Sequence, residues 1–513
     1  MRLRNIRRCY RFEPGDDLTK NKKLVRNSVA SIAQIVIAGG TLFLLYAFLI
    51  RGLGAEIVGV WSFVMAISSL ARIGEVGLTG SVVKYVAKHL ATAKEDHSAL
   101  IVQTALLWVL LGVGVAVTCF YPLFSWVLKQ TLDVASFAIA ETLLPYACVF
   151  YVLSSLVSVL HFALDGCHQI TIRSIILSVS AVLFLLLALV LVPIYGLLGL
   201  LISQIIQVVV MGVVSYYFVR KSLPSLPLVP YRWSKDAFKE MIGYGIHFNT
   251  ISIAEILFEP SVKYMLAKFG GLSSVVYYEM ASRLVIQLRA AFVAVNKALV
   301  PYISELCETS PEQVSKVYVK TYSIQLYFGV PVFGLIATAG YFISYIWMGY
   351  LAVEFVFFLI LLSAGWFLNA LSVPSFYSNL GTGQLKWNVL SYLLIIILTF
   401  AMGHALGPIL GSYAVVLAWV LSLIIGSFMV MHAYHRQFNL RVRDFLPAGL
   451  RVYFLLGVLS VLVCLYPQLT HTPFGLSLNM FAPIIFAMFM VAPFWRHPLR
   501  RYVFEHLQSG LSR

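Results

Sequence analysis

The chain has 513 residues, of which 60% are hydrophobic and only 11% are charged. A soluble domain carries about a quarter charged residues, so this composition excludes an ordinary soluble fold. The net charge of +16 is typical of basic segments that face the anionic headgroups of a membrane, and it therefore does not indicate nucleic acid as a partner.

Long apolar runs recur along the whole chain. A run of about eighteen residues crosses the hydrocarbon layer as a helix, and these runs are nearly uniform rather than alternating, which favours helices over a β-barrel. The sequence therefore predicts an all-α polytopic membrane protein. Its 14 transmembrane helices are expected near 28–50, 56–88, 98–127, 138–164, 170–192, 196–219, 243–267, 272–301, 318–348, 353–380, 388–409, 411–435, 447–468 and 476–495.

The basic residues test this helix order. If the N-terminus is inside, 29 of the 37 Lys and Arg residues fall in inside segments and the adjoining span ends, and only three fall in outside loops. Cytoplasmic loops hold the excess of Lys and Arg. Both ends of the chain are therefore expected to be cytoplasmic.

The chain also repeats itself. LIRGLGAEIVG at 49–59 resembles LAKFGGLSSVV at 266–276, at an offset of 217, and GCHQ at 166–169 resembles GTGQ at 381–384, at an offset of 215. The matched positions are Arg51 with Lys268, Gly54 with Gly271, Val58 with Val275, Arg72 with Arg289 and Gly196 with Gly411. Each match falls at the same place in the helix order.

These matches predict two six-helix lobes related by an axis along the membrane normal, an arrangement that transporters use for alternating access. The expected divisions are a basic cytoplasmic tail at 1–27, an N-lobe of helices 1–6 at 28–219, a basic, Pro-rich cytoplasmic linker at 220–242, a C-lobe of helices 7–12 at 243–435, and helices 13–14 with a basic cytoplasmic tail at 436–513.

Charged residues are concentrated in three of the spans. In the second span Arg72 and Glu75 are one turn apart, and the stretch 74–81 is expected to be loose helix or a break. In the seventh span Glu255, Glu259 and Lys263 share one face, and Pro260 favours a kink.

The eighth span holds four charges. At 100° per residue, Glu279, Arg283 and Lys297 fall within about 40° of one another, and Arg289 flanks this stripe. A charge at the centre of a bilayer costs about 2.5–3.5 kcal/mol. We therefore expect the charged face of this helix to line a wet cavity.

Two interpretations of these charges remain open. Glu279 with Arg283, and Glu259 with Lys263, could be ion pairs that only hold helices together, and Lys297 could extend toward the cytoplasmic surface. Arg72 and Arg289 have no carboxylate at i±4, and their matched positions favour binding of an anionic substrate, because a guanidinium binds phosphate in a bidentate manner. Glu255 is the best candidate for a coupling-ion or proton site, or else a partner for one of the arginines.

The sequence contains no sign of an enzyme or a metal centre. The six cysteines are scattered singly, without metal or redox spacing. The predicted outside loops are short, and none holds a paired carboxylate or a histidine cluster. No ATP-binding loop of the GxxxxGK[ST] kind occurs, so the energy would come from an ion or voltage gradient or from substrate supply.

Two regions resemble a known family. LGAEIVGVWSFVMAISSLARIGEVGLTGSVVKYVAKHL at 53–90 resembles the first loop and second helix of Wzx-type oligosaccharide flippases, which belong to the multidrug/oligosaccharidyl-lipid/polysaccharide (MOP) exporter superfamily. VVYYEMASRLVIQLRAAF at 275–292 and ALVPYISEL at 298–306 resemble the eighth helix of the same group. Many members carry Asp-x-Gly where this chain has Glu75-Val76-Gly77.

The resemblance implies a flippase, not an enzyme. It would carry a polyprenyl-pyrophosphate-linked oligosaccharide from the cytoplasmic to the outer leaflet of a bacterial inner membrane, for polysaccharide (lipopolysaccharide/O-antigen or capsule) biosynthesis. The substrate is expected to bind in a cationic cavity between the lobes, lined by Arg72, Lys263, Arg283, Arg289 and Lys297. Coupling or gating would involve Glu75, Glu255, Glu259 and Glu279.

Further consequences of the resemblance concern ligands and partners. No cofactor is expected beyond a coupling ion, H⁺ or Na⁺. The expected partners are membrane lipids and other polysaccharide-assembly membrane proteins, and the chain is taken as a monomer. Two alternatives stay open: a multidrug/ion antiporter, for which an acidic cavity would suit cationic drugs, and a lipid II flippase of the same superfamily.

Overall fold

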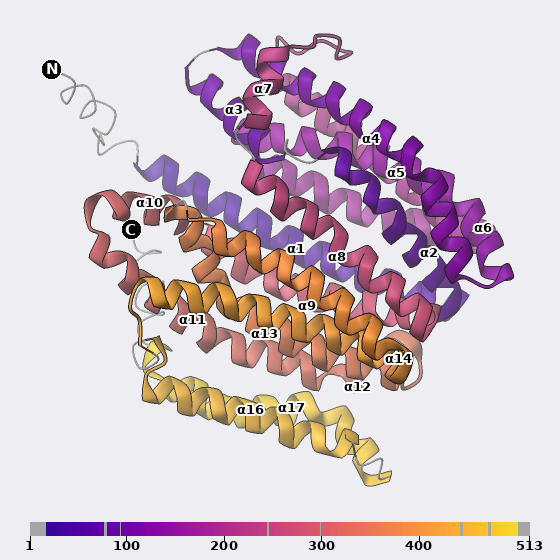
Figure 1. The fold of residues 1–513 in the computed structure, drawn as a ribbon, viewed down its shortest axis with the longest axis vertical. Helices are drawn as coiled ribbons and strands as arrows, with labels where there is room; N and C mark the ends of the chain where they lie inside the picture. Colours follow the sequence, from indigo (N-terminus) through magenta and orange to yellow (C-terminus); the bar gives the residue numbers. More distant parts are fainter. Residues whose placement is uncertain are drawn as a thin grey trace.

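The computed structural model describes residues 17–75, 79–92, 94–243, 246–297, 299–382, 384–441, 445–469 and 473–500. Within these ranges the chain is helical apart from short connections, and the long helices run roughly side by side (Figure 1). Eleven helical stretches among the described residues are long and apolar enough to cross a membrane. The predicted all-α polytopic fold is confirmed.

The first part of the chain, drawn in indigo to magenta in Figure 1, forms one bundle. We call it the N-terminal bundle. Its elements are α1 (Asp17–Leu53), α2 (Ala55–Ser68), the 3₁₀ helix η2 (Ser69–Glu75), α3 (Thr79–Ala91), α4 (Glu95–Thr131), α5 (Val134–Gly166) and α6 (Ile170–Ser222). α1 packs along α6, and α5 lies between α4 and α6.

The second bundle, the C-terminal bundle, follows the short linker helix α7 (Lys235–Gly243). Its elements are α8 (Ile246–Gly270), α9 (Leu272–Lys297), α10 (Leu299–Thr309), α11 (Pro311–Thr338), α12 (Gly340–Met348), α13 (Val353–Thr382) and α14 (Lys386–Gln437). The last two helices, α16 (Ala448–Leu469) and α17 (Pro473–Arg496), pair with each other and pack on α11 (Figure 1).

The longest helices, α6 and α14, are hairpins that each turn at a single glycine. Gly196 (φ 58°) and Gly411 (φ 62°) lie in a backbone region that side chains rarely adopt. The reversal at Gly196 brings Ser180 within hydrogen-bonding distance of Met211. The predicted breaks at these two glycines are confirmed.

The predicted continuous span 56–88 is wrong in one respect, because it is divided into α2, η2 and α3. The 3₁₀ segment agrees with the loose helix expected near residue 74. A side chain at Gly74 would collide with the backbone of Gly112 in α4. The close approach of η2 to α4 therefore depends on glycine and coincides with the break. The predicted span 318–348 is likewise divided, into α11 and α12 at Ala339.

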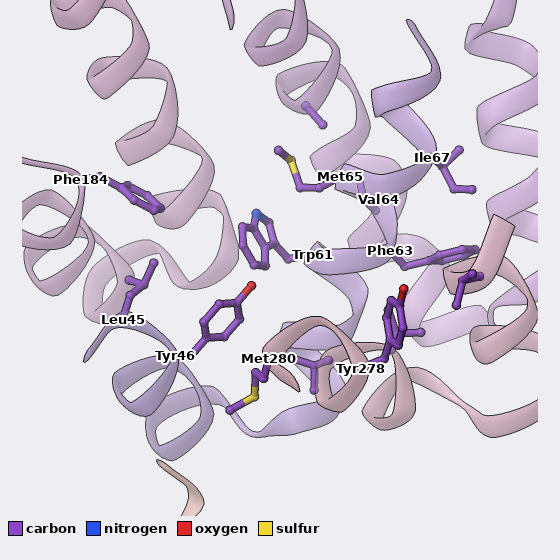
Figure 2. Packing of buried hydrophobic residues seen from close by; sticks show 14 of the residues in the cluster. Leu45, Tyr46, Trp61, Phe63, Val64, Met65, Ile67, Phe184, Tyr278 and Met280 are labelled. Carbon is purple, nitrogen blue, oxygen red and sulfur yellow. The ribbon is translucent and has the colours of Figure 1, made fainter. Parts of the chain in front are cut away.

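The two bundles meet along α2 and α9. Near the start of both helices, Gly59 lies so close to Leu272 that a side chain at residue 59 would collide with the Leu272 backbone. At the same end, the Arg51 guanidinium donates to the carbonyls of Ile346 (2.5 Å) and Trp347 (3.3 Å) at the end of α12. Figure 2 shows the adjoining core, where Tyr46 and Trp61 lie near Met280 of α9.

The linker is bound to the N-terminal bundle. Gln103 of α4 accepts hydrogen bonds from the backbone of Tyr231 (3.3 Å) and Arg232 (3.2 Å), and Thr104 accepts one from Ser234 (3.3 Å). Trp108 of α4 packs against aromatic rings of the linker, including Phe238 of α7 at 4.5 Å. These contacts hold α7 against α3 and α4.

Candidate functional site: a charged cavity between two bundles

Two adjoining cavities contain the charged side chains, one between the bundles and one within the C-terminal bundle. The larger, about 990 Å³, is lined mainly by the N-terminal bundle together with α8 and α9. The smaller, about 430 Å³, is lined by α8, α9, α13 and α14. Five residues line both: Glu255, Glu259, Glu279, Arg283 and Lys297. The charged face predicted for the eighth span therefore does line a cavity.

Glu279 is the centre of the interactions between the bundles. Its side chain is 5% exposed and carries four contacts. One oxygen accepts from Tyr46 of α1 (3.1 Å) and from Arg283 of α9 (2.7 Å). The other accepts from Ser62 of α2 (3.3 Å) and forms an ion pair with Lys263 of α8. One buried carboxylate thus joins four helices.

The remaining charges of this cluster come from α8 and α9. Lys263 is 3% exposed and also pairs with Glu259 one turn earlier, at 2.7 Å. Arg283 is half exposed and lies 3.8 Å from the same Glu259 carboxylate. The two predicted ion pairs, Glu279 with Arg283 and Glu259 with Lys263, are both present. The contact between Lys263 and Glu279, which connects them, was not predicted.

The sequence repeat explains why this cluster lies where the bundles meet. Ser62 and Glu279 are 217 residues apart, which is the offset of the repeat, and their side chains are in contact. Tyr46 and Lys263 are also 217 apart, and both contact Glu279. The sequence analysis did not identify Tyr46 or Ser62, because it considered only charged residues in the spans.

Arg72 is paired with a carboxylate. It lies in η2, and its guanidinium contacts Glu75 at 2.6 Å. The Glu75 side chain is 5% exposed, whereas that of Arg72 is 44% exposed and lines the larger cavity. One oxygen of Glu75 is buried without a hydrogen-bond partner. Glu75, three residues after Arg72, therefore neutralises this arginine.

Arg289 has different surroundings. Its Nε donates to the amide oxygen of Asn369 at 2.7 Å, and its guanidinium lies over the ring of Trp366 at 4.8 Å. The Asn369 amide in turn donates to Ser427 at 2.8 Å. Among the described residues, no carboxylate lies within 4 Å of Arg289. Neutral groups thus hold this cation against the wall of the smaller cavity.

Glu255 and Lys297 complete the lining. The Glu255 carboxylate accepts a hydrogen bond from Tyr392 of α14 at 3.1 Å. Within the described ranges it forms no ion pair with Arg283 or Arg289, which was the alternative considered for it. Lys297 is exposed in the last turn of α9 and lines both cavities.

The described lining of the two cavities is nearly balanced in formal charge, whereas a cationic cavity was expected. Asp165 and Arg173 both line the larger cavity and form an ion pair at 3.0 Å. The sequence analysis did not identify this pair. The described lining carries six basic and five acidic side chains: Arg72, Arg173, Lys263, Arg283, Arg289 and Lys297, with Glu75, Asp165, Glu255, Glu259 and Glu279. Among these described basic side chains, Arg289 and Lys297 are the two that form no ion pair.

A polytopic helical protein with two bundles and a charged cavity between them has the architecture expected of a membrane transporter. Comparison with solved structures identifies the fold. A structure of the lipid II flippase MurJ in an inward closed conformation matches 91% of this chain and 98% of its own, with a TM-score of 0.68 and 14% identity. An inward-facing multidrug resistance MATE family transporter of the MOP superfamily matches 81% of this chain and 98% of its own, with a TM-score of 0.64 and 14% identity.

Sequence comparison gives the family. Residues 24–307 match the family described as "Polysaccharide biosynthesis protein". The match covers more than half of the chain, so the chain belongs to this family, and the resemblance inferred from residues 53–90 and 275–306 is confirmed. A Shigella flexneri protein named "Putative O-antigen transporter" is 22% identical over 427 residues, which are 81% of this chain and 98% of that protein.

Proposed function

We propose that this protein moves a polyprenyl-pyrophosphate-linked oligosaccharide from the cytoplasmic to the outer leaflet of a bacterial inner membrane, for cell-surface polysaccharide biosynthesis. The family match and the name of the Shigella flexneri relative support the substrate class. The observation that carries the proposal is Arg289, a guanidinium placed in the cavity by Asn369 and Trp366. Its charge is available to the pyrophosphate because no carboxylate among the described residues takes it.

The chain is proposed to work as two six-helix lobes, 28–219 and 243–435, joined by the linker 220–242. If α6 and α14 each cross twice and α8 crosses once, fourteen crossings result, with both termini cytoplasmic. Matched backbone conformations support the repeat: Gly54 and Gly271 have φ values of 86° and 82°, and Gly196 and Gly411 have 58° and 62°. The contact between Ser62 and Glu279 supports an axis between the lobes.

The lobes are proposed to rock around Glu279, with the cavity open to the cytoplasm in this conformation. The contacts of Gly59 with Leu272 and of Arg51 with α12 close the opposite end. The fold is also more similar to the inward-facing MATE structure (TM-score 0.64) than to an outward-facing one (TM-score 0.55). Lipid-linked sugar would enter from the cytoplasmic leaflet, and breaking the closed end would release it on the other side.

The basic residues have unequal roles in this mechanism. Arg289 and Lys297 bind the pyrophosphate directly, whereas Arg72, Arg283 and Lys263 keep their carboxylate partners and contribute weaker, longer-range attraction. Glu255, which has a tyrosine partner but no ion pair among the described residues, is the proposed site for a coupling ion. Glu75, Glu259 and Glu279 hold the basic residues and gate the passage.

A transport assay tests the proposal. The protein is reconstituted in liposomes with a labelled polyprenyl-pyrophosphate oligosaccharide, and movement between leaflets is measured. Losing a charge-assisted contact costs about 1.5–3 kcal/mol, so Arg289→Ala is expected to reduce transport about 10- to 100-fold. Arg436→Ala, an exposed arginine at the end of α14, is the matched control. Equal rates in the two variants would show that Arg289 has no part in binding.

The same liposomes separate the alternatives. The MurJ fold match supports lipid II as a second candidate, because it also carries a polyprenyl pyrophosphate. Lipid II is therefore supplied to parallel samples, and a cationic dye is supplied under a proton or sodium gradient to others. Transport of the dye with no movement of either lipid would indicate an antiporter and would exclude the flippase.

A further inference from the structure

Two histidines and a glutamate meet at the end of the N-terminal bundle that carries the linker. His89 lies in the last turn of α3, His97 in the first turn of α4, and Glu240 on the linker helix α7. One ligand atom from each lies within 4.8 Å of the other two. None of the three lines the cavity described above, so the transport mechanism does not use them.

Backbone contacts position the two imidazoles. The amide of Lys94 donates to the carbonyl of His89 at 2.8 Å, and Ser98 of α4 donates to the carbonyl of Val86 in α3 at 3.3 Å. This turn places the rings of His89 and His97 edge to face, with their centroids 4.3 Å apart. Their arrangement is therefore set by the fold and not by a flexible loop.

The candidate ligand atoms lie close enough together to share one ion. Nε2 of His89 and Nε2 of His97 lie 3.7 Å and 3.8 Å from the same Glu240 oxygen, Oε2. These separations are too long for hydrogen bonds. A tetrahedral ion with bonds of about 2.0–2.1 Å holds its ligand atoms about 3.3 Å apart, so each histidine nitrogen would approach the Glu240 oxygen by about half an ångström.

Burial supports the same interpretation. The His89 side chain is 10% exposed, and its Nε2 is buried without a hydrogen-bond partner. A buried nitrogen without a partner costs stability, and a metal ion would satisfy it. The His97 side chain is 37% exposed and leaves a path for the ion.

Lys88 carries a positive charge that opposes a cation here. Its ammonium lies 2.9 Å from the other Glu240 oxygen, Oε1. Lys88 is half exposed and holds only that oxygen. The carboxylate thus faces Lys88 with one oxygen and the two histidines with the other, so it can serve both.

We propose that His89, His97 and Glu240 bind a divalent first-row transition-metal ion, with zinc as the best match to two imidazoles and one carboxylate. The ion would join α3, α4 and α7. Because residues 231–234 are already held by Gln103 and Thr104 of α4, it would attach the whole end of the linker to the N-terminal bundle. The site does not depend on what the protein transports.

Metal binding to the full-length protein in detergent, prepared without a histidine tag and stripped with a chelator, tests this proposal. Zn²⁺ is titrated calorimetrically, and Co²⁺ binding is followed by visible absorption. We expect one ion per chain, binding weakened at least tenfold in His97→Gln and in Glu240→Gln, and a Zn²⁺-dependent rise in Tm that both variants lose. His432→Gln, an exposed histidine on α14, serves as the matched control and should bind as the wild type does.

Three results would overturn the proposal. They are an absence of saturable binding by the wild type, equal binding by all variants, and a loss of binding in Lys88→Gln as large as that in Glu240→Gln. The last result would mean that Glu240 acts only by positioning α7 through its ion pair with Lys88. His97 is chosen over the buried His89 because its exposed side chain can be replaced with little effect on folding. Gel filtration of each variant confirms the folded state.

Discussion

Arg72 and Arg289 occupy the same position in the two halves of the chain, 217 residues apart, yet their surroundings differ. Arg72 contacts a buried carboxylate at 2.6 Å. Arg289 is held by an amide and an indole, with no carboxylate within 4 Å among the residues that the structure describes. The two matched positions both hold an arginine, but only that of the C-terminal bundle lacks a carboxylate partner among the described residues. Binding of an anion is therefore expected to be concentrated in the C-terminal bundle.

The same asymmetry appears where the halves meet. The C-terminal bundle supplies the charged members, Lys263 and Glu279, and the equivalent residues of the N-terminal bundle are the neutral Tyr46 and Ser62. Backbone features, by contrast, are shared, as Gly196 and Gly411 show. The matched positions thus share backbone conformation at the glycines but differ in charge where the bundles meet.

The largest effect is expected at Glu279. Removing one partner of a buried ion pair costs about 3–5 kcal/mol, and Glu279→Gln leaves the buried Lys263 with only the half-exposed Glu259. We expect a large fall in Tm, measured by thermal unfolding in detergent. Glu259→Gln is the control, because that carboxylate is 48% exposed. Among the described residues it forms no ion pair or hydrogen bond with the N-terminal bundle. Equal falls in Tm would show that Glu279 contributes no more to stability than Glu259 does.

The two hairpin glycines are expected to give the next largest effect. Gly196 (φ 58°, ψ −136°) and Gly411 (φ 62°, ψ −143°) lie in a backbone region that is nearly restricted to glycine. A side chain there costs about 1–3 kcal/mol, so Gly196→Ala and Gly411→Ala should each lower the stability by that amount. Gly411→Ala should cost slightly more, because its new methyl group would lie 3.3 Å from the Phe269 carbonyl, whereas Gly196 has open space. Gly114→Ala, in open space within α4, is the control and should not lower the stability, because alanine is the better helix former. A loss at only one hairpin would contradict the shared backbone.

Much of this fold could be predicted from the sequence. Long apolar runs, glycine breaks and the offset of 217 residues were sufficient for the helical membrane fold and for the charged face of the eighth span. The loosening near residue 74 was expected from the sequence, but its cause, the packing of Gly74 against Gly112, 38 positions away, could not be predicted.

The site was predictable only where one helix carries both partners. Glu259 with Lys263 and Glu279 with Arg283 follow helical spacing, whereas the Lys263–Glu279 contact joins two helices. The environment of Arg289 depends on Asn369, 80 residues away. The cluster of His89, His97 and Glu240 was missed for the same reason, since it draws on three elements and its residues have no motif spacing.

The smallest effect is expected from a substitution that gives Arg289 a carboxylate neighbour, as Arg72 has. Asn369→Asp would place a carboxylate 2.7 Å from the Arg289 guanidinium, if the backbone is unchanged, and so would give Arg289 the surroundings of Arg72. An ion pair in a wet cavity is worth about 1 kcal/mol, so binding of a polyprenyl pyrophosphate, measured by equilibrium titration in detergent, should weaken about fivefold. Asn369→Ser removes the amide contact without adding a charge. If Asn369→Asp and Asn369→Ser weaken binding equally, Arg289 needs its anchor but not its free charge. If only Asn369→Asp weakens it, the absence of a nearby carboxylate is what distinguishes the C-terminal arginine from its N-terminal counterpart.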